Sequence, residues 1–111
     1  MRLIKENEGE HYEPAHHHDA YCVRKISKAD GCGKLSVSVS EFLPGGGCDL
    51  TASDKDRSYY ILQGTLEVYG EGTDPFIMEA GDMLFVPAGE KRGYKITGSE
   101  RCRMIVMIQE V

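Results

Sequence analysis

The chain has 111 residues, of which 41% are hydrophobic and 28% are charged, and its formal net charge is −5. These values are typical of one globular domain and exclude an intrinsically disordered chain. The acidic balance, with no basic run, argues against nucleic acid and against an anionic membrane as partners. Because the sequence has no run of about 18 apolar residues and no apolar leader at its start, we expect a cytoplasmic location.

Strands and turns are predicted along most of the chain. Residues 1–20 are polar and are expected to form an N-terminal arm, followed by a single domain over residues 21–111. The segment 35–40 alternates apolar and polar residues strictly, which is typical of a half-buried strand, and the Pro-Gly-Gly-Gly run at 44–47 is read as a flexible turn that ends it. Such short strands with frequent turns favour an all-β sandwich or small barrel. Further strands are predicted at residues 58–62, 65–69, 76–78, 83–86, 93–96 and 102–108.

Two glycine skeletons mark the middle of the chain. Gly45 and Gly64 enclose the first, which ends in the aromatic and aliphatic run of residues 60–64. The second covers residues 81–89 and ends in Pro-Ala-Gly. Both resemble, in order and spacing, the two sequence motifs of the cupin superfamily. The resemblance implies an all-β double-stranded β-helix, the jelly roll or cupin barrel, with a pocket inside.

The resemblance also locates the positions at which cupins usually hold a divalent metal, with two His and a Glu in the first motif and a His in the second. Thr51 and Ser53 occupy the His pair, Arg57 the Glu position and Arg92 the second-motif His position. Arginine offers no lone pair and keeps its proton in proteins. One guanidinium about 5 Å from a +2 ion is repelled by roughly 6–7 kcal/mol at an effective dielectric near 20. No metal cofactor is therefore expected at the usual place.

The residues at these positions predict an anion site instead. Two guanidinium groups about 5 Å apart repel each other by roughly 3 kcal/mol, and an arginine fork matches a carboxylate or phosphate with two hydrogen bonds. Residues two apart on a strand share a face, so the two hydroxyl residues and the tyrosine that follows each arginine are expected to line one cavity. We predict binding of a small anionic metabolite, such as a carboxylate or sugar acid, in a pocket that lacks the usual metal. The predicted ligand-binding residues are Thr51, Ser53, Arg57, Tyr59, Arg92 and Tyr94.

A competing interpretation is that the two arginines form internal ion pairs that fill the old metal site. Buried arginines are usually paired within the protein. Glu41 and Asp49 are the candidate partners for Arg57 and Arg92.

All four histidines fall within eight positions near the start of the chain, mixed with carboxylates: His11, Glu13, His16, His17, His18 and Asp19. The alternative function is a metal-dependent cupin enzyme, a dioxygenase or a sugar isomerase or lyase, with His16, His17 and His18 as ligands of a divalent ion. The spacing is poor for that role, because in an extended arm His16 and His18 share a face while His17 points the other way. If the arm reaches the pocket, His17 becomes a pocket residue or proton shuttle. A metal-free enzyme that uses a tyrosine or histidine as acid or base also stays open.

The four cysteines, Cys22, Cys32, Cys48 and Cys102, match no zinc module and are expected to be reduced thiols. Cys48 follows the glycine run at the predicted pocket rim. A neighbouring Arg57 would lower its pKa and make it a nucleophile, although no fixed base is evident beside it.

The apolar run at residues 104–108 lacks strict alternation, which indicates burial on both faces of the last strand. Small jelly rolls leave sheet edges open, and the cupins that this chain resembles commonly close them by dimerising. We therefore expect a homodimer.

Overall fold

The computed structural model describes residues 1–110; Val111, the last residue of the predicted domain 21–111, lies outside the described part. The described residues form nine strands and one short 3-10 helix, η1 (Lys28–Asp30). The strands are β1 (Glu10–Tyr12), β2 (His17–Ile26), β3 (Leu35–Thr51), β4 (Arg57–Gln63), β5 (Leu66–Gly70), β6 (Thr73–Met78), β7 (Met83–Val86), β8 (Arg92–Lys95) and β9 (Cys102–Gln109). In this part of the chain, no helix is long and apolar enough to cross a membrane.

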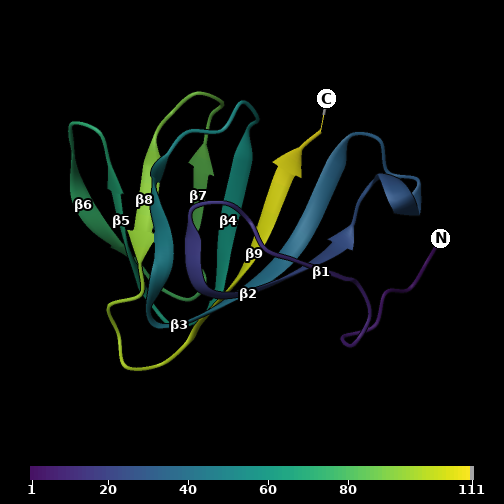
Figure 1. The fold of residues 1–111 in the computed structure, drawn as a ribbon, viewed down its shortest axis with the longest axis horizontal. Helices are drawn as coiled ribbons and strands as arrows, with labels where there is room; N and C mark the ends of the chain where they lie inside the picture. The colour runs from purple at the N-terminus through teal and green to yellow at the C-terminus, as the bar shows by residue number, and fades with distance from the viewer. Residues whose placement is uncertain (111) are drawn as a thin grey trace.

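The sheet follows the order β6-β5-β8-β3-β9-β4-β7, and β2 pairs with the remaining edge of β3 while β1 pairs with β2. Strand β3 joins the two layers, because its first half pairs with β9 and its second half pairs with β8. In Figure 1, β6, β5 and β8 lie on the left and β9 and the first half of β3 lie on the right. Every pairing is antiparallel, so the two layers close into a jelly roll and the predicted all-β double-stranded β-helix is confirmed.

The core lies between the layers and is built from alternate residues of the strands, as the pleat requires. On β4, for example, Tyr59 and Ile61 are 2% and 0% exposed, whereas the next residue, Leu62, is exposed. One contiguous cluster holds the interior together: Phe42, Cys48, Tyr59, Ile61, Leu66, Val68, Met78, Val86, Tyr94, Ile96, Cys102, Met104 and Val106. Four polar residues are buried as well, Ser36, Ser38, Ser40 and Arg92, and Arg92, at 4% exposed, is the charged member of this group.

The glycine run at 44–47 is part of β3 and not the turn that its composition predicts. A Cβ atom on Gly47, whose φ is 156°, would lie 2.1 Å from the carbonyl oxygen of Tyr94 on β8. A Cβ atom on Gly46 would lie 2.8 Å from the carbonyl oxygen of His18 on β2. The missing side chains therefore let three backbones pack closely, which places His17, Cys48 and Tyr94 in one paired row across β2, β3 and β8.

Strand β2 is absent from the predicted elements, and it runs through the boundary drawn at residue 20. Its alternation is weak because the positions that face the interior carry the small residues Ala20 and Cys22, while Tyr21 is exposed. Pairing with β1 on one edge and β3 on the other holds β2 in the sheet. The remaining predicted strands fall within observed strands, apart from shifts of a residue at some ends.

Candidate functional site

A cavity of about 480 Å³ opens at one end of the barrel, where β3 ends and where β2, β4 and β8 begin. The β3–β4 and β7–β8 loops lie at this end, at the top of Figure 1. The cavity is lined by Pro14, Ala15, His16, His17, Thr51, Ala52, Ser53, Asp54, Arg57 and Arg92. Four of the six residues predicted to bind the ligand are thus brought together.

Arg92 forms the buried floor of this cavity. It lies opposite Thr51 in the β3–β8 ladder, and its Nη1 donates to the Thr51 carbonyl oxygen at 2.8 Å. Its Nε donates to the hydroxyl oxygen of Tyr59 at 2.9 Å. Both acceptors are neutral, so the guanidinium is held in one orientation while its charge remains uncompensated.

The two predicted tyrosines lie beneath the cavity and are not among its lining residues. Tyr59 accepts the hydrogen bond from Arg92, and Tyr94 packs edge-on against Tyr59 with the ring centroids 5.7 Å apart. Burial raises the pKa of Tyr94 well above its ordinary value, and the nearby Tyr59 raises it further. Tyr94 therefore stays a protonated phenol, and it packs against Tyr59, which in turn holds Arg92.

Arg57 is the first residue of β4 and lines the opposite wall. Its Nε atom is buried and has no hydrogen-bond partner. Within residues 1–110, no carboxylate oxygen lies within 4.0 Å of a nitrogen of Arg57 or Arg92. An orphaned buried guanidinium nitrogen is costly unless a ligand or water satisfies it.

The carboxylates expected to pair with these arginines lie elsewhere. Glu41 faces Arg103 and Arg101, with O···N separations of 3.3 and 3.9 Å. Asp49 lies 3.9 Å from Nδ1 of His18. The interpretation in which Glu41 or Asp49 neutralises the arginines is therefore wrong.

The rim is fixed by hydrogen bonds between the two motif loops. The backbone N–H of Gly89 donates to the carbonyl oxygen of Ser53 at 2.7 Å, and that of Ala88 donates to Asp56 at 2.8 Å. Because β3 ends at Thr51, Ser53 lies in the loop and does not share a strand face with it as the alternation predicts. Both residues line the cavity all the same.

Asp54 is the lining residue with chemistry that the sequence analysis missed. It is exposed and lies in the loop between Ser53 and Arg57. The sequence signal that could have identified Asp54 is its place between two predicted site residues, Ser53 and Arg57. It supplies one negative charge at the rim, opposed to the two positive charges deeper in the cavity.

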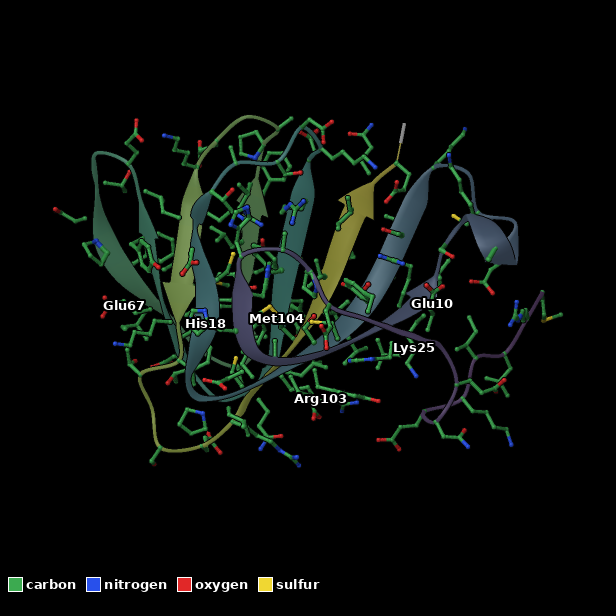
Figure 2. The ribbon with its side chains drawn as sticks, viewed as in Figure 1. Glu10, His18, Lys25, Glu67, Arg103 and Met104 are labelled. Atoms are coloured by element: carbon green, nitrogen blue, oxygen red, sulfur yellow. The ribbon has the colours of Figure 1, made fainter. Side chains whose placement is uncertain are left out.

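The four histidines separate in the structure. His16 and His17 line the cavity, His18 (Figure 2) lies near Asp49, and His11 stacks on the exposed ring of Tyr21 at 4.6 Å. Among residues 1–110, no group of three or more His, Cys, Asp or Glu side chains is arranged to hold a metal ion. The residues at the usual metal positions are two hydroxyls and two guanidiniums, which do not fit a divalent cation.

Cys48 also differs from the nucleophile considered above. Its side chain is completely buried, and its Sγ donates to the carbonyl oxygen of Asp49 at 3.3 Å. Burial raises the pKa of Cys48, and this effect outweighs the opposing influence of Arg92 and Arg57. The activation by Arg57 inferred from the sequence is therefore wrong, and the thiol belongs to the core.

Comparison with solved structures places this barrel among known folds. The polyketide cyclase RemF from Streptomyces resistomycificus superposes with a TM-score of 0.88 at 17% identity, covering 100% of this chain and 80% of that one. A predicted oxalate decarboxylase from Thermotoga maritima gives 0.82 at 18% identity over 99% of this chain and 100% of that one. KdgF from Halomonas sp. gives 0.81 at 15% identity over 99% and 95%. At these identities the likeness shows the fold alone.

Comparison of the sequence itself gives a family match. No curated protein matches the chain. Residues 38–108 match the Cupin domain family, a stretch that contains both glycine skeletons and most of the cavity's lining. Since this match covers well over half of the chain, and the barrel agrees with it, the chain belongs to the cupin family.

Proposed function

We propose that this cupin binds a small anionic metabolite, a carboxylate or sugar acid, in the cavity at the open end of the barrel, without a metal at the usual position. The observation that carries the proposal is the presence of two guanidinium groups, Arg57 and Arg92, that face one cavity while no carboxylate oxygen of residues 1–110 lies within 4.0 Å of their nitrogens. A ligand is then the natural source of the missing negative charge.

The energetics favour an anion over an empty or water-filled cavity. Removing a guanidinium from water costs several kcal/mol unless a partner repays it. Each charge-assisted hydrogen bond to a carboxylate contributes roughly 1.5–3 kcal/mol. The volume of about 480 Å³ lies within the range usual for small-molecule sites. The hydroxyls of Thr51 and Ser53 supply further donors at the rim.

Isothermal titration calorimetry with acetate, succinate, gluconate and inorganic phosphate tests this proposal. We expect Arg57→Gln to weaken binding of the best anion by about 10- to 100-fold, which corresponds to the loss of one charge-assisted bond. Arg101→Gln is the matched control, since it removes the same charge from a half-exposed side chain outside the cavity. Equal affinity in the wild type and Arg57→Gln, or no binding of any of these anions, contradicts the proposal.

The metal-dependent alternative has its own test. Protein purified without a tag would contain stoichiometric iron, manganese, nickel or zinc if the histidines or other groups held a metal. Elemental analysis that finds less than a tenth of an equivalent of each metal, together with anion binding in the presence of a chelator, agrees with the anion-binding proposal. A full equivalent of any of these metals overturns its metal-free part.

We also propose that the chain forms a homodimer through the outer face of the sheet. Five strands pair their apolar residues side by side in one outward row, Val23, Val39, Ile105, Tyr60 and Met83. The N-terminal residues 5–9 lie against the β2 end of this row, where a Cβ atom on Gly9 would lie 2.6 Å from Val23. At the other end of the row, Met83 is 61% exposed. Glu41, Arg101 and Arg103 border it with both signs of charge, so a second copy related by a twofold axis offers matching charges as well as apolar surface.

A further inference from the structure

The cavity contains a nitrogen base that the anion proposal leaves unused. His17 lines the cavity at the first position of β2. Its Nδ1 lies 2.7 Å from the carbonyl oxygen of Ala15. Because a carbonyl can only accept, the proton of the neutral ring is assigned to Nδ1, and Nε2 remains as a free acceptor.

The fold holds the ring of His17 in place. The ring packs against Phe42 at 6.1 Å and edge-on against Tyr94 at 6.0 Å. His16, the preceding residue, has a φ of 65°, an uncommon value for a residue other than glycine. This backbone turn starts β2 with the His17 side chain on the same side of the sheet as Cys48, its partner on β3.

Charged and titratable groups approach His17 from each neighbouring element. Arg92 and Tyr94 come from β8, Arg57 from β4 and Cys48 from β3, while His16 and Asp54 share the cavity lining. Burial lowers the pKa of His17; the hydrogen bond to Ala15 opposes this, and the charges of Arg92 and Arg57 lower the pKa further. The imidazole is therefore neutral at neutral pH while the cavity is empty of anions.

An anion between the guanidiniums reverses these conditions. It cancels the positive field that keeps the ring neutral and presents an oxygen to which Nε2–H can donate. We propose that His17 takes up a proton from solvent when the anion binds and so becomes the third cationic contact of the site. The added positive charge makes the site select dianions. This inference rests on the proposed anion binding. Arg57, Arg92 and protonated His17 carry three positive charges against one negative charge on Asp54, and the remaining two match a dianion.

Calorimetry with succinate as the dianion and acetate as the monoanion tests the proposal. At pH 7, titrations in Bis-Tris and in imidazole, which differ in ionisation heat, report the protons taken up. We expect wild-type protein to take up close to one proton per succinate and to bind succinate at least about tenfold more tightly than acetate. Affinity for succinate should fall as pH rises from 6 to 8, since proton uptake and binding are linked.

The variant His17→Gln removes the titrating group and keeps a side chain able to donate. We expect it to bind succinate about 5- to 30-fold more weakly, with no proton uptake and no pH dependence. His11→Gln is the control, because that histidine lies outside the cavity, stacked on Tyr21, and it should keep the uptake. If His17→Gln does not fold, an NMR titration of the wild-type imidazole settles the point, since the pKa of His17 should rise on adding succinate.

The outcomes separate the two proposals. Succinate binding without proton uptake, or uptake that persists in His17→Gln, overturns the role of His17 and leaves the anion site standing. An unchanged His17 pKa in saturating succinate does the same. Failure of the wild-type protein to bind succinate, acetate, gluconate and phosphate overturns the proposed function itself.

Discussion

The mouth of the barrel and the outer face of the sheet formed by β2, β3, β9, β4 and β7 share strands but present opposite kinds of residue. On β4, Arg57 and Tyr59 point to the interior, and Arg57 lines the cavity, whereas Tyr60 and Leu62 point outward. A sheet with one solvated face normally places apolar residues inside and polar ones outside. Here the mouth is cationic and the outer face is apolar.

This contrast is the basis of both proposals, an anion at the mouth and a second copy of the chain at the outer face. Natural strands break local rules where function requires it. Under the two proposals, an anion pairs with the cations at the mouth and a second protein surface covers the exposed apolar residues of the outer face.

The variant Ile105→Glu tests the outer face. Ile105 sits in the middle of the apolar row, opposite Val39 and Tyr60. Burying two unpaired carboxylates in a twofold interface costs several kcal/mol, so we expect dimer affinity to fall by about a thousandfold or more. Sedimentation velocity checks this, with Gln109→Glu on an exposed part of the same strand as control. A wild-type chain that sediments as a monomer at high micromolar concentration contradicts the dimer.

The variant Gly47→Ala tests how the mouth is assembled. The new Cβ atom would lie 2.1 Å from the Tyr94 carbonyl oxygen at a φ of 156°, so β3 and β8 must separate. We expect a loss of about 2–4 kcal/mol in the free energy of unfolding, measured by urea denaturation. Gly33→Ala, where a Cβ atom meets nothing within 4 Å, should change it by less than about 1 kcal/mol. Similar losses in both variants would mean that the close approach of the strands is unimportant.

Thiol labelling compares the dry interior with the surface. Burial raises the pKa of Cys102 to about 11, with a further contribution from Glu100. At pH 8 the thiol then carries about a hundredth of the thiolate that an unshifted cysteine would. We expect iodoacetamide to modify Cys32, which is only partly buried, about 100-fold faster, as followed by mass spectrometry. Equal rates would show that water enters the barrel.

The smallest expected effect is a pH dependence of stability that originates at the mouth. Because the folded-state pKa of His17 lies below the ordinary 6.5, the unfolded chain binds more protons between the two values. The free energy of unfolding should therefore decrease as pH falls below about 6.5. Urea denaturation at pH 5.5 and 7.5 measures the decrease, which should be smaller in His17→Gln and unchanged in His18→Gln. The predicted sign is wrong if the free energy of unfolding of wild type, relative to that of His17→Gln, increases from pH 7.5 to pH 5.5.

Turn spacing and strand alternation predicted an all-β domain, and the specific barrel came from the resemblance of Gly45, Gly64 and residues 81–89 to the cupin motifs. The same resemblance assigned Thr51, Arg57 and Arg92 to one pocket, and the structure has all three in one cavity. Such positions are fixed by ladder register and not by side-chain preference, which is why they transfer from motif to structure.

Other parts could not be predicted because they depend on contacts distant in sequence. β2 has weak alternation, so its place beside β3, and with it the entry of His17 into the cavity, depends on the pairing itself. The run at 44–47 has the composition of a turn but serves as a close-packed strand. Strand parity placed Tyr94 on the correct side, yet only the packing of Tyr59 over it shows that it supports the floor.

The length of β3 has a consequence for how the molecule moves. A single uninterrupted strand of 17 residues contributes Val37 and Val39 to the outer face and Thr51 to the mouth. It is paired on both edges over residues 37–42 and again at Gly47 and Cys48. Native-state hydrogen exchange should therefore release its amides as one cooperative block, and occupancy at one end should slow exchange at the other.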